Sequence, residues 1–239
     1  MSDTDFKDSS PEKFKRKIRS FVRREGRLTK GQQRALDELF PQYGLVVEEE
    51  SDTLDLATIF GNDHPVHLEI GFGNGQTLTY MASQKPEANY VGIEVHRPGV
   101  GNALLQIEEQ KLSNVRVICH DAVEVLNQSI SDQSLSAVYI FFPDPWHKKR
   151  HHKRRLIQPN FVELLKRKLK TGGVLHYATD WENYAEHMME VMKGIDGFEN
   201  LAGQGKYSPK PEYRPTTKFE TRGIRLGHGV WDMLFKKTA

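Results

Sequence analysis

The sequence predicts an α/β fold, a doubly wound and mostly parallel sheet preceded by a basic N-terminal extension. Five short apolar segments alternate with helical segments from residue 66 onward, which is typical of strands buried on both faces. A glycine-rich turn joins the first strand to the first helix. Carboxylates follow at or near the strand ends, where open α/β sheets bind their ligands. These patterns predict a polar ligand site at one edge of the sheet.

The elements are expected in the following order. Residues 1–12 are polar and aperiodic, which predicts disorder, and a short helix at 31–40 is expected to end at Pro41. Periodicity predicts strands at 66–70, 90–95, 115–119, 137–142 and 173–178, and helices at 76–84, 99–111, 122–129, 158–170 and 182–193. Two late strands are expected at 197–201 and 229–235, with an irregular, proline-rich loop between them. We therefore divide the chain into an extension, 1–60, and a sheet domain, 61–239.

Composition excludes several classes of protein. The chain has 239 residues, 37% of them hydrophobic, and no stretch approaches the roughly 18 apolar residues of a membrane helix. Its polar start has no apolar signal-peptide region, which disfavours secretion. Cys119 is the one cysteine, so an internal disulfide and a cysteine-based zinc site are excluded. The histidines have no metal-site spacing, so we expect no metal and a cytoplasmic protein.

Charge is strongly segregated along the chain. Residues 13–34 carry a net charge of +9 and residues 148–155 add +6, although the whole chain totals only +2. The rest of the chain is therefore acidic. Such segregation predicts a basic surface for a polyanion, and we expect residues 13–34 to form an RNA-binding arm.

The glycine turn and the acids beside it suggest a cofactor. The turn lies in the segment LEIGFGNGQTL and uses alternate positions, Gly71, Gly73 and Gly75. Such a turn can also be a simple strand-to-helix connection that binds no ligand. Glu94, at the end of the next strand, also suits the ribose of NAD. However, the glycine spacing differs from the pyrophosphate-binding pattern, and Glu69 before the turn would repel a pyrophosphate. A carboxylate there suits the ammonium and sulfonium groups of S-adenosylmethionine.

Later acids and cations each allow two interpretations. Asp121 can accept from an adenine amino group or cap the helix that follows it. Asp144, between two prolines, can hold a base or form a turn, and Trp146 can stack on a base or pack in the core. The run 148–155 can bind phosphates or remain a solvated loop. Asp180 can cap the last long helix or face a substrate.

Six segments resemble the bacterial tRNA (guanine-N7-)-methyltransferase family, TrmB. They are LEIGFGNG, GIEVHRPGVG, HDAVEVL, FFPDPWHKKRHHKRR, ATDWENYAEHM and RPTTKFETRG, within a match from about residue 13 to the C-terminus. The resemblance implies a Rossmann-like methyltransferase that transfers a methyl group from S-adenosylmethionine to N7 of the variable-loop guanine, nucleotide 46, in tRNA. It also favours a monomer.

The resemblance assigns roles to matching positions. Cofactor contacts are implied for Glu69, Glu94, Asp121 and Asp144, and Asp144 is also the implied catalytic residue. Substrate contacts are implied for Lys148, Asp180, Thr217, Lys218, Phe219 and Glu220. RNA contacts are implied for Arg150, His151, His152, Lys153, Arg154 and Arg155.

The chemistry of the implied reaction agrees with these residues. Guanine N7 has an in-plane lone pair and no proton, so positioning can supply most of the acceleration, on the order of 7–11 kcal/mol. We assign Asp144 an orienting and electrostatic role toward the purine, which becomes positive during the reaction. Three alternatives remain: methylation of an exocyclic amine, since PDPW is loosely similar to Asp-Pro-Pro-Tyr loops; a non-catalytic RNA-binding module; and an NAD-dependent oxidoreductase.

Overall fold

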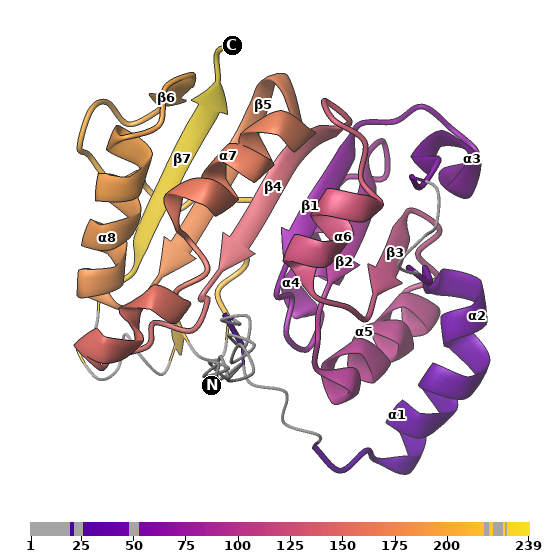
Figure 1. Cartoon of the computed structure of the whole chain (residues 1–239). Coiled ribbons are helices and arrows are strands. Elements are labelled where there is room, and N and C mark those ends of the chain that lie inside the picture. Colours follow the sequence, from indigo (N-terminus) through magenta and orange to yellow (C-terminus); the bar gives the residue numbers. More distant parts are fainter. Residues whose placement is uncertain (1–19, 22–25, 48–52, 218–219, 222–226, 228) are drawn as a thin grey trace, which may run out of the picture.

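Seven strands form one sheet of order β3-β2-β1-β4-β5-β7-β6 in a computed structural model of the chain (Figure 1). The structure describes residues 20–21, 26–47, 53–217, 220–221, 227 and 229–239. The strands are β1 (Val66–Ile70), β2 (Asn89–Ile93), β3 (Val115–Ile118), β4 (Leu135–Phe141), β5 (Leu169–Thr179), β6 (Phe198–Asn200) and β7 (Trp231–Lys237). The first five strands are parallel, and β7 runs antiparallel to β5 and β6. The predicted, mostly parallel sheet is confirmed.

Helices cover both faces of the sheet. One face packs against α6 (Ala122–Gln128), α7 (Pro159–Lys168) and α8 (Glu182–Lys193), and α6 and α7 lie in front of the sheet in Figure 1. The other face packs against α4 (Gln76–Gln84) and α5 (Arg97–Glu109). Strand side chains alternate between the faces, so Leu68 and Ile70 join the first core and Tyr90 and Tyr139 the second. None of the helices within the described ranges has the length and hydropathy needed to cross a membrane.

The N-terminal helix corrects one prediction. It consists of α1 (Lys30–Arg34), a π-helical stretch η1 (Ala35–Leu39) and α2 (Phe40–Tyr43), so the prediction that Pro41 ends the helix is wrong. Pro41 follows the π-helical stretch and lies at the start of α2, where its missing N–H breaks no hydrogen bond. Arg34, within the predicted basic arm, pairs with Glu108 of α5 at 2.6 Å.

Two further elements lie where no element was predicted. They are α3 (Leu56–Phe60) and a 3₁₀-helix, η2 (Lys149–Arg154), which contains most of the second cationic run. Residues 208–217 of the late loop, which the structure describes, form no regular helix or strand, as expected, and Tyr213 covers β4 and β5 on the second face. The ring of Tyr213 lies 5.8 Å from that of Tyr139 and 5.6 Å from that of His176. A residue of the proline-rich segment therefore packs directly against side chains of the sheet.

α5 packs directly against the glycine turn. A Cβ atom added at Gly99 would lie 2.1 Å from the carbonyl oxygen of Gly73, and one added at Gly75 would lie 2.5 Å from Cβ of Ala103. Neither contact leaves room for a side chain. The sequence alone predicts no role for Gly99, yet its lack of a side chain is what allows α5 to pack this closely against the turn.

We predict that Gly99→Ala lowers the melting temperature. Helix propensity alone would make alanine stabilising by about 1 kcal/mol, but the collision with Gly73 costs about 1–3 kcal/mol and displaces the turn. Gly194→Ala is the control, because a Cβ there meets its nearest atom at 3.5 Å. Thermal unfolding followed by circular dichroism checks this, and equal melting temperatures for the two variants would contradict it.

Candidate functional site

A cavity of about 720 Å³ opens at the carboxyl ends of the strands. Its walls include the glycine turn, the ends of β2 and β4, and the start of α6. Of the predicted site residues, it brings together Gly71, Glu94, Asp121, Asp144, Lys148 and His151. The strand-end acids are thus neighbours in space although they lie far apart in the chain.

The glycine turn is shaped for a ligand that approaches its backbone. Gly71 and Gly73 have φ values of 73° and 60°, a backbone conformation that residues other than glycine rarely adopt. A Cβ at either position would meet nothing within 4 Å. Neighbouring protein atoms therefore do not exclude a side chain at these two positions, and the open space is where a ligand can lie against the turn.

Glu94 ties the turn to the end of β2. Its Oε2 accepts a hydrogen bond from the backbone N–H of Gly73 at 2.9 Å. Its Oε1 accepts from the N–H groups of Val95 and His96 at 2.7 and 3.0 Å. Since each carboxylate oxygen has about two lone-pair sites, Oε1 is fully engaged, and Oε2 can still accept from a hydroxyl group of a ribose.

Glu69 is buried beneath the turn rather than exposed to the cavity. Its side chain lies in β1 at 2% exposure, and Oε2 has no hydrogen-bond partner among the described atoms. Burial, together with the nearby Glu94 carboxylate, raises the pKa of Glu69 to about 8. A buried carboxyl oxygen without a partner, next to a ligand cavity, fits a ligand that carries positive charge.

Asp121 caps the N-terminus of α6, which is one of the two roles that the sequence predicts for it. Its Oδ1 accepts from the N–H groups of Val123 and Glu124 at 2.8 and 3.2 Å at the start of α6. Both bonds use the same oxygen, so Oδ2 is the atom that can accept from a ligand in the cavity. Capping and ligand binding are therefore compatible here.

The segment that carries Asp144 is held in a strained conformation. Phe142 and Trp146 have φ values of 50° and 47°, which are uncommon for bulky residues. Arg155, 2% exposed, donates to the Pro145 carbonyl at 3.0 Å and to Oδ1 of Asn183 in α8 at 2.8 Å. Such strain persists only where the surroundings enforce it, and it is frequent at active sites.

Trp146 packs against the N-terminal segment rather than in the core. Its Nε1 donates to the Ser20 carbonyl at 3.0 Å, and the Arg154 guanidinium lies 3.9 Å from its ring centroid. Arg154 also donates to the Phe21 carbonyl at 3.3 Å. Ser20 and Phe21 thereby form part of the cavity rim.

The cationic run divides into inward and outward side chains. Arg150 and Lys153 are exposed, whereas Arg155 is buried and His152 lies at 3.1 Å from Nη2 of Arg155. Lys148 is exposed at the cavity mouth. Only the outward members can meet a phosphate without rearrangement.

Asp180, Thr217 and Glu220 are not among the residues that line the cavity. Asp180 follows β5 and is half-buried, and α8 has Trp181 as its N-cap without any side-chain cap, so the capping interpretation of Asp180 is wrong. Thr217 is half-buried and Glu220 is 3% exposed, bonded to Arg214. Lys218 and Phe219 lie outside the described residues, as do residues 1–19 and 22–25 of the extension.

Sequence reasoning missed two buried charged residues near the site, Arg214 and Asp232. One signal existed: Asp232 interrupts the apolar strand β7 at a position that faces the covered side of the sheet. For the residues that the structure does describe, no three side chains among His, Cys, Asp and Glu are grouped as a metal site requires.

Comparison with known proteins gives the family. A family profile described as "Putative methyltransferase" matches residues 63–233. The chain is 59% identical to a protein of Alcanivorax borkumensis named tRNA (guanine-N(7)-)-methyltransferase, over 98% of this chain and 97% of that protein. It is 60% identical to a Klebsiella pneumoniae protein of the same name, over 93% of this chain and 92% of that protein.

A solved structure agrees with the fold. The 16S rRNA methyltransferase KamB superposes with a TM-score of 0.56 at 13% identity, covering 81% of this chain and 99% of that chain. At this identity the likeness concerns the fold alone, and it confirms the predicted Rossmann-like methyltransferase type of sheet. The profile and the relatives carry the rest of the assignment, which confirms the resemblance found in the six segments. This chain belongs to the tRNA (guanine-N(7)-)-methyltransferase family.

Proposed function

We propose that this protein transfers a methyl group from S-adenosylmethionine to N7 of a guanine in tRNA, at nucleotide 46 of the variable loop. The observation that carries the proposal is one cavity that joins the glycine turn and strand-end acids to Asp144, with cations at its mouth. Relatives about 60% identical over nearly the whole chain, all named for this activity, support the reaction and the substrate.

The cofactor, when bound, supplies an electrophilic methyl group on a sulfonium. Gly71 and Gly73 would let it lie against the backbone, Glu94 would accept from its ribose, and Asp121 would accept from its adenine amino group. Glu69 is protonated near neutral pH in the cofactor-free protein, and the positive charge of the cofactor would lower its pKa, so that the carboxylate would supply negative charge beneath the turn. These residues fit S-adenosylmethionine better than a dinucleotide, since a pyrophosphate would meet carboxylates.

Asp144 would face the acceptor base. Guanine N7 attacks with a lone pair, so no residue needs to remove a proton from it first. The Asp144 carboxylate would accept from guanine N1–H and N2–H and stabilise the positive charge that develops on the purine. Lys148, Asp180 and Thr217 are proposed to hold the same nucleotide.

The RNA would bind along the cationic run and the N-terminal arm. Arg150 and Lys153, which are exposed, would contact phosphates, with His151, His152 and Arg154 beside them. Arg155 would act mainly through the Pro145 carbonyl that it holds. We further propose that the protein works as a monomer in the cytoplasm, consistent with its single cysteine and a tRNA substrate.

One assay tests both the activity and the role of Asp144. Unmodified tRNA incubated with the protein and S-adenosylmethionine should yield 7-methylguanosine, identified by mass spectrometry of the nucleosides. Asp144→Asn should lower the single-turnover rate about 100- to 1,000-fold, because electrostatic stabilisation is lost, and leave tRNA affinity nearly unchanged. An N2- or N6-methylated product would refute the proposal, as would an Asp144→Asn enzyme that binds tRNA poorly but reacts normally.

Removing the outward cations should weaken tRNA binding and its salt dependence. The Arg150→Ala/Lys153→Ala variant should reduce the slope of log K against log[salt] by about 1.4–1.8, since each of the two lost phosphate contacts contributes about 0.7–0.9. Lys170→Ala/Lys193→Ala is the charge-matched control, because both lysines are exposed, lie near the start of β5 and at the end of α8, and are not among the cavity residues. Filter binding between low and moderate salt measures the slopes. Equal slopes for the two variants would show that the RNA binds to another surface of the protein.

Glu69 should make the cofactor-free protein less stable as pH rises. The folded state keeps the Glu69 proton up to pH about 8, whereas the unfolded chain loses it near 4.5. Stability attributable to this group therefore falls between those pH values, by up to about 1.4 kcal/mol per pH unit. Glu69→Gln should remove that dependence, and Glu199→Gln, which changes an exposed side chain, should not. Denaturant unfolding across the window measures this, and parallel curves for wild type and Glu69→Gln would disprove it.

A further inference from the structure

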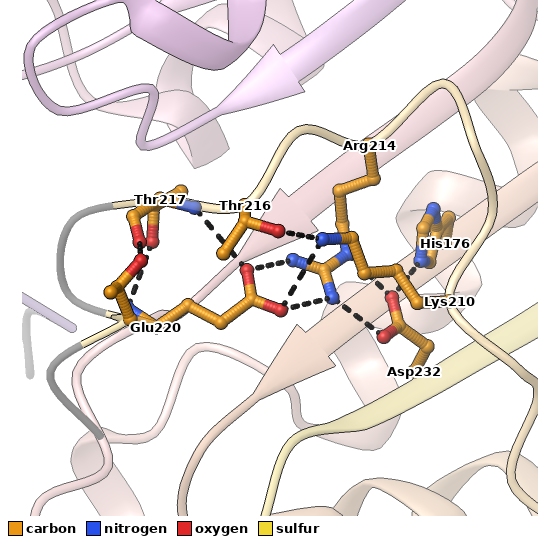
Figure 2. A network of polar contacts seen from close by, with 8 residues as sticks. His176, Lys210, Arg214, Thr216, Thr217, Glu220 and Asp232 are labelled. Atoms are coloured by element: carbon orange, nitrogen blue, oxygen red, sulfur yellow. Dashed lines mark hydrogen bonds and ion pairs between the residues drawn. The ribbon is translucent and has the colours of Figure 1, made fainter. Parts of the chain in front are cut away.

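A buried ionic network lies beneath the late loop, outside the cavity. Arg214 is 1% exposed, and its two carboxylate partners, Asp232 of β7 and Glu220, are each 3% exposed. Figure 2 shows the guanidinium between the two carboxylates. It donates to Asp232 through Nε and Nη2, both at 2.7 Å, and to Glu220 through Nη1 and Nη2 at 2.8 and 3.1 Å. Four of its five N–H groups are thus engaged by buried acceptors.

The network extends into the sheet through His176 of β5. Nε2 of His176 donates to Oδ1 of Asp232 at 2.7 Å, and Nδ1 accepts from the Tyr213 hydroxyl at 2.9 Å. Burial lowers the pKa of His176 despite the opposing effect of Asp232, so the ring is neutral near pH 7. Two adjacent residues of the loop, Tyr213 and Arg214, are therefore fixed to two adjacent strands.

The same guanidinium contacts the segment that carries Asp144. Its carbon lies 5.5 Å from the ring centroid of Phe142 and 5.9 Å from that of Phe141. Phe142 lines the cavity, has a positive φ, and precedes Pro143 and Asp144. Arg214 is therefore a structural link between the late loop and the catalytic segment.

Glu220 is committed to this network on both oxygens. Its Oε2 accepts from Nη1 of Arg214 and from the backbone N–H of Thr217 at 3.3 Å, and its Oε1 accepts from Nη2 of Arg214. Thr217 in turn accepts, through Oγ1, from the N–H of Glu220 at 3.1 Å. Because Glu220 is only 3% exposed, a direct contact with a base would require its side chain to move away from Arg214, and an incompletely paired guanidinium would then stay buried. Thr217 is the more exposed of the two residues.

We propose, building on the function proposed above, that Arg214, Asp232 and Glu220 are positioning residues for methyl transfer. They hold Thr217 and Phe142 in the arrangement in which the guanine is received. Glu220 acts through Arg214, not on the base.

Two variants at opposite ends of the network test the proposal. Glu220→Gln and Asp232→Asn keep the side-chain shape and remove one charge each, and Glu199→Gln is the exposed control in β6. Each network variant should lower the single-turnover rate at saturating tRNA at least about tenfold, because the loop and the segment lose their alignment. Affinities for tRNA and for S-adenosylhomocysteine should change less than about threefold, which separates positioning from loss of the fold. The double variant should be no slower than the worse single variant, since both act through one guanidinium.

A normal single-turnover rate for Asp232→Asn together with a slow Glu220→Gln would overturn the proposal. A double variant whose loss of rate equals the product of the two single losses would also overturn it. A second measurement needs Glu220→Gln alone. A tRNA with inosine in place of the methylated guanosine lacks the base amino group. Wild type and Glu220→Gln should then differ by the same factor as on normal tRNA. If the difference disappears, Glu220 contacts that amino group and the proposal is wrong.

The proposed function is tested separately from the positioning role. Wild-type enzyme is assayed for 7-methylguanosine in the same experiment. Absence of that product would refute the proposed function before any variant is compared. Multiplying losses in an enzyme that does form 7-methylguanosine would refute only the positioning role.

Discussion

Two buried arginines hold the segment on which the site depends. Arg155 fixes the Pro145 carbonyl from the side of α8, and Arg214 packs against Phe142 from the side of the late loop. Burying a guanidinium is costly unless its N–H groups meet acceptors, so each arginine constrains every group bonded to it. The left-handed backbone at Phe142 and Trp146 can persist under that constraint. The place of Asp144 at the cavity follows from these contacts.

Much of the fold could be predicted from local pattern. Apolar strands and helical periods alternate clearly from residue 66, and the sheet has the expected strands in the expected places. Pro41 was misjudged because a π-helical stretch before it shifts the hydrogen-bond register, which no composition rule signals. The elements α3 and η2 were missed because they are short and owe their form to packing rather than to periodicity.

The site was partly predictable for a simple geometric reason. The carboxyl ends of parallel strands lie at one edge of the sheet. Glu94, Asp121 and Asp144 therefore come together there, regardless of how the side chains around them pack. The orientation of side chains was not predictable in the same way. Nothing within a run of cations indicates that Arg155 turns inward while Arg150 stays exposed. Arg214 finds Asp232 only through the pairing of β7 with β5, a contact between distant parts of the chain.

The central claim is that the strand-end acids and the glycine turn form one cofactor site beside Asp144. A crystal structure of the protein grown with S-adenosylhomocysteine tests it most directly. We expect the ribose at Glu94, the adenine beside Asp121, and the sulfur on the side of the cavity that Asp144 lines. Product bound away from these residues, with the cavity of this structure left empty, would contradict the account.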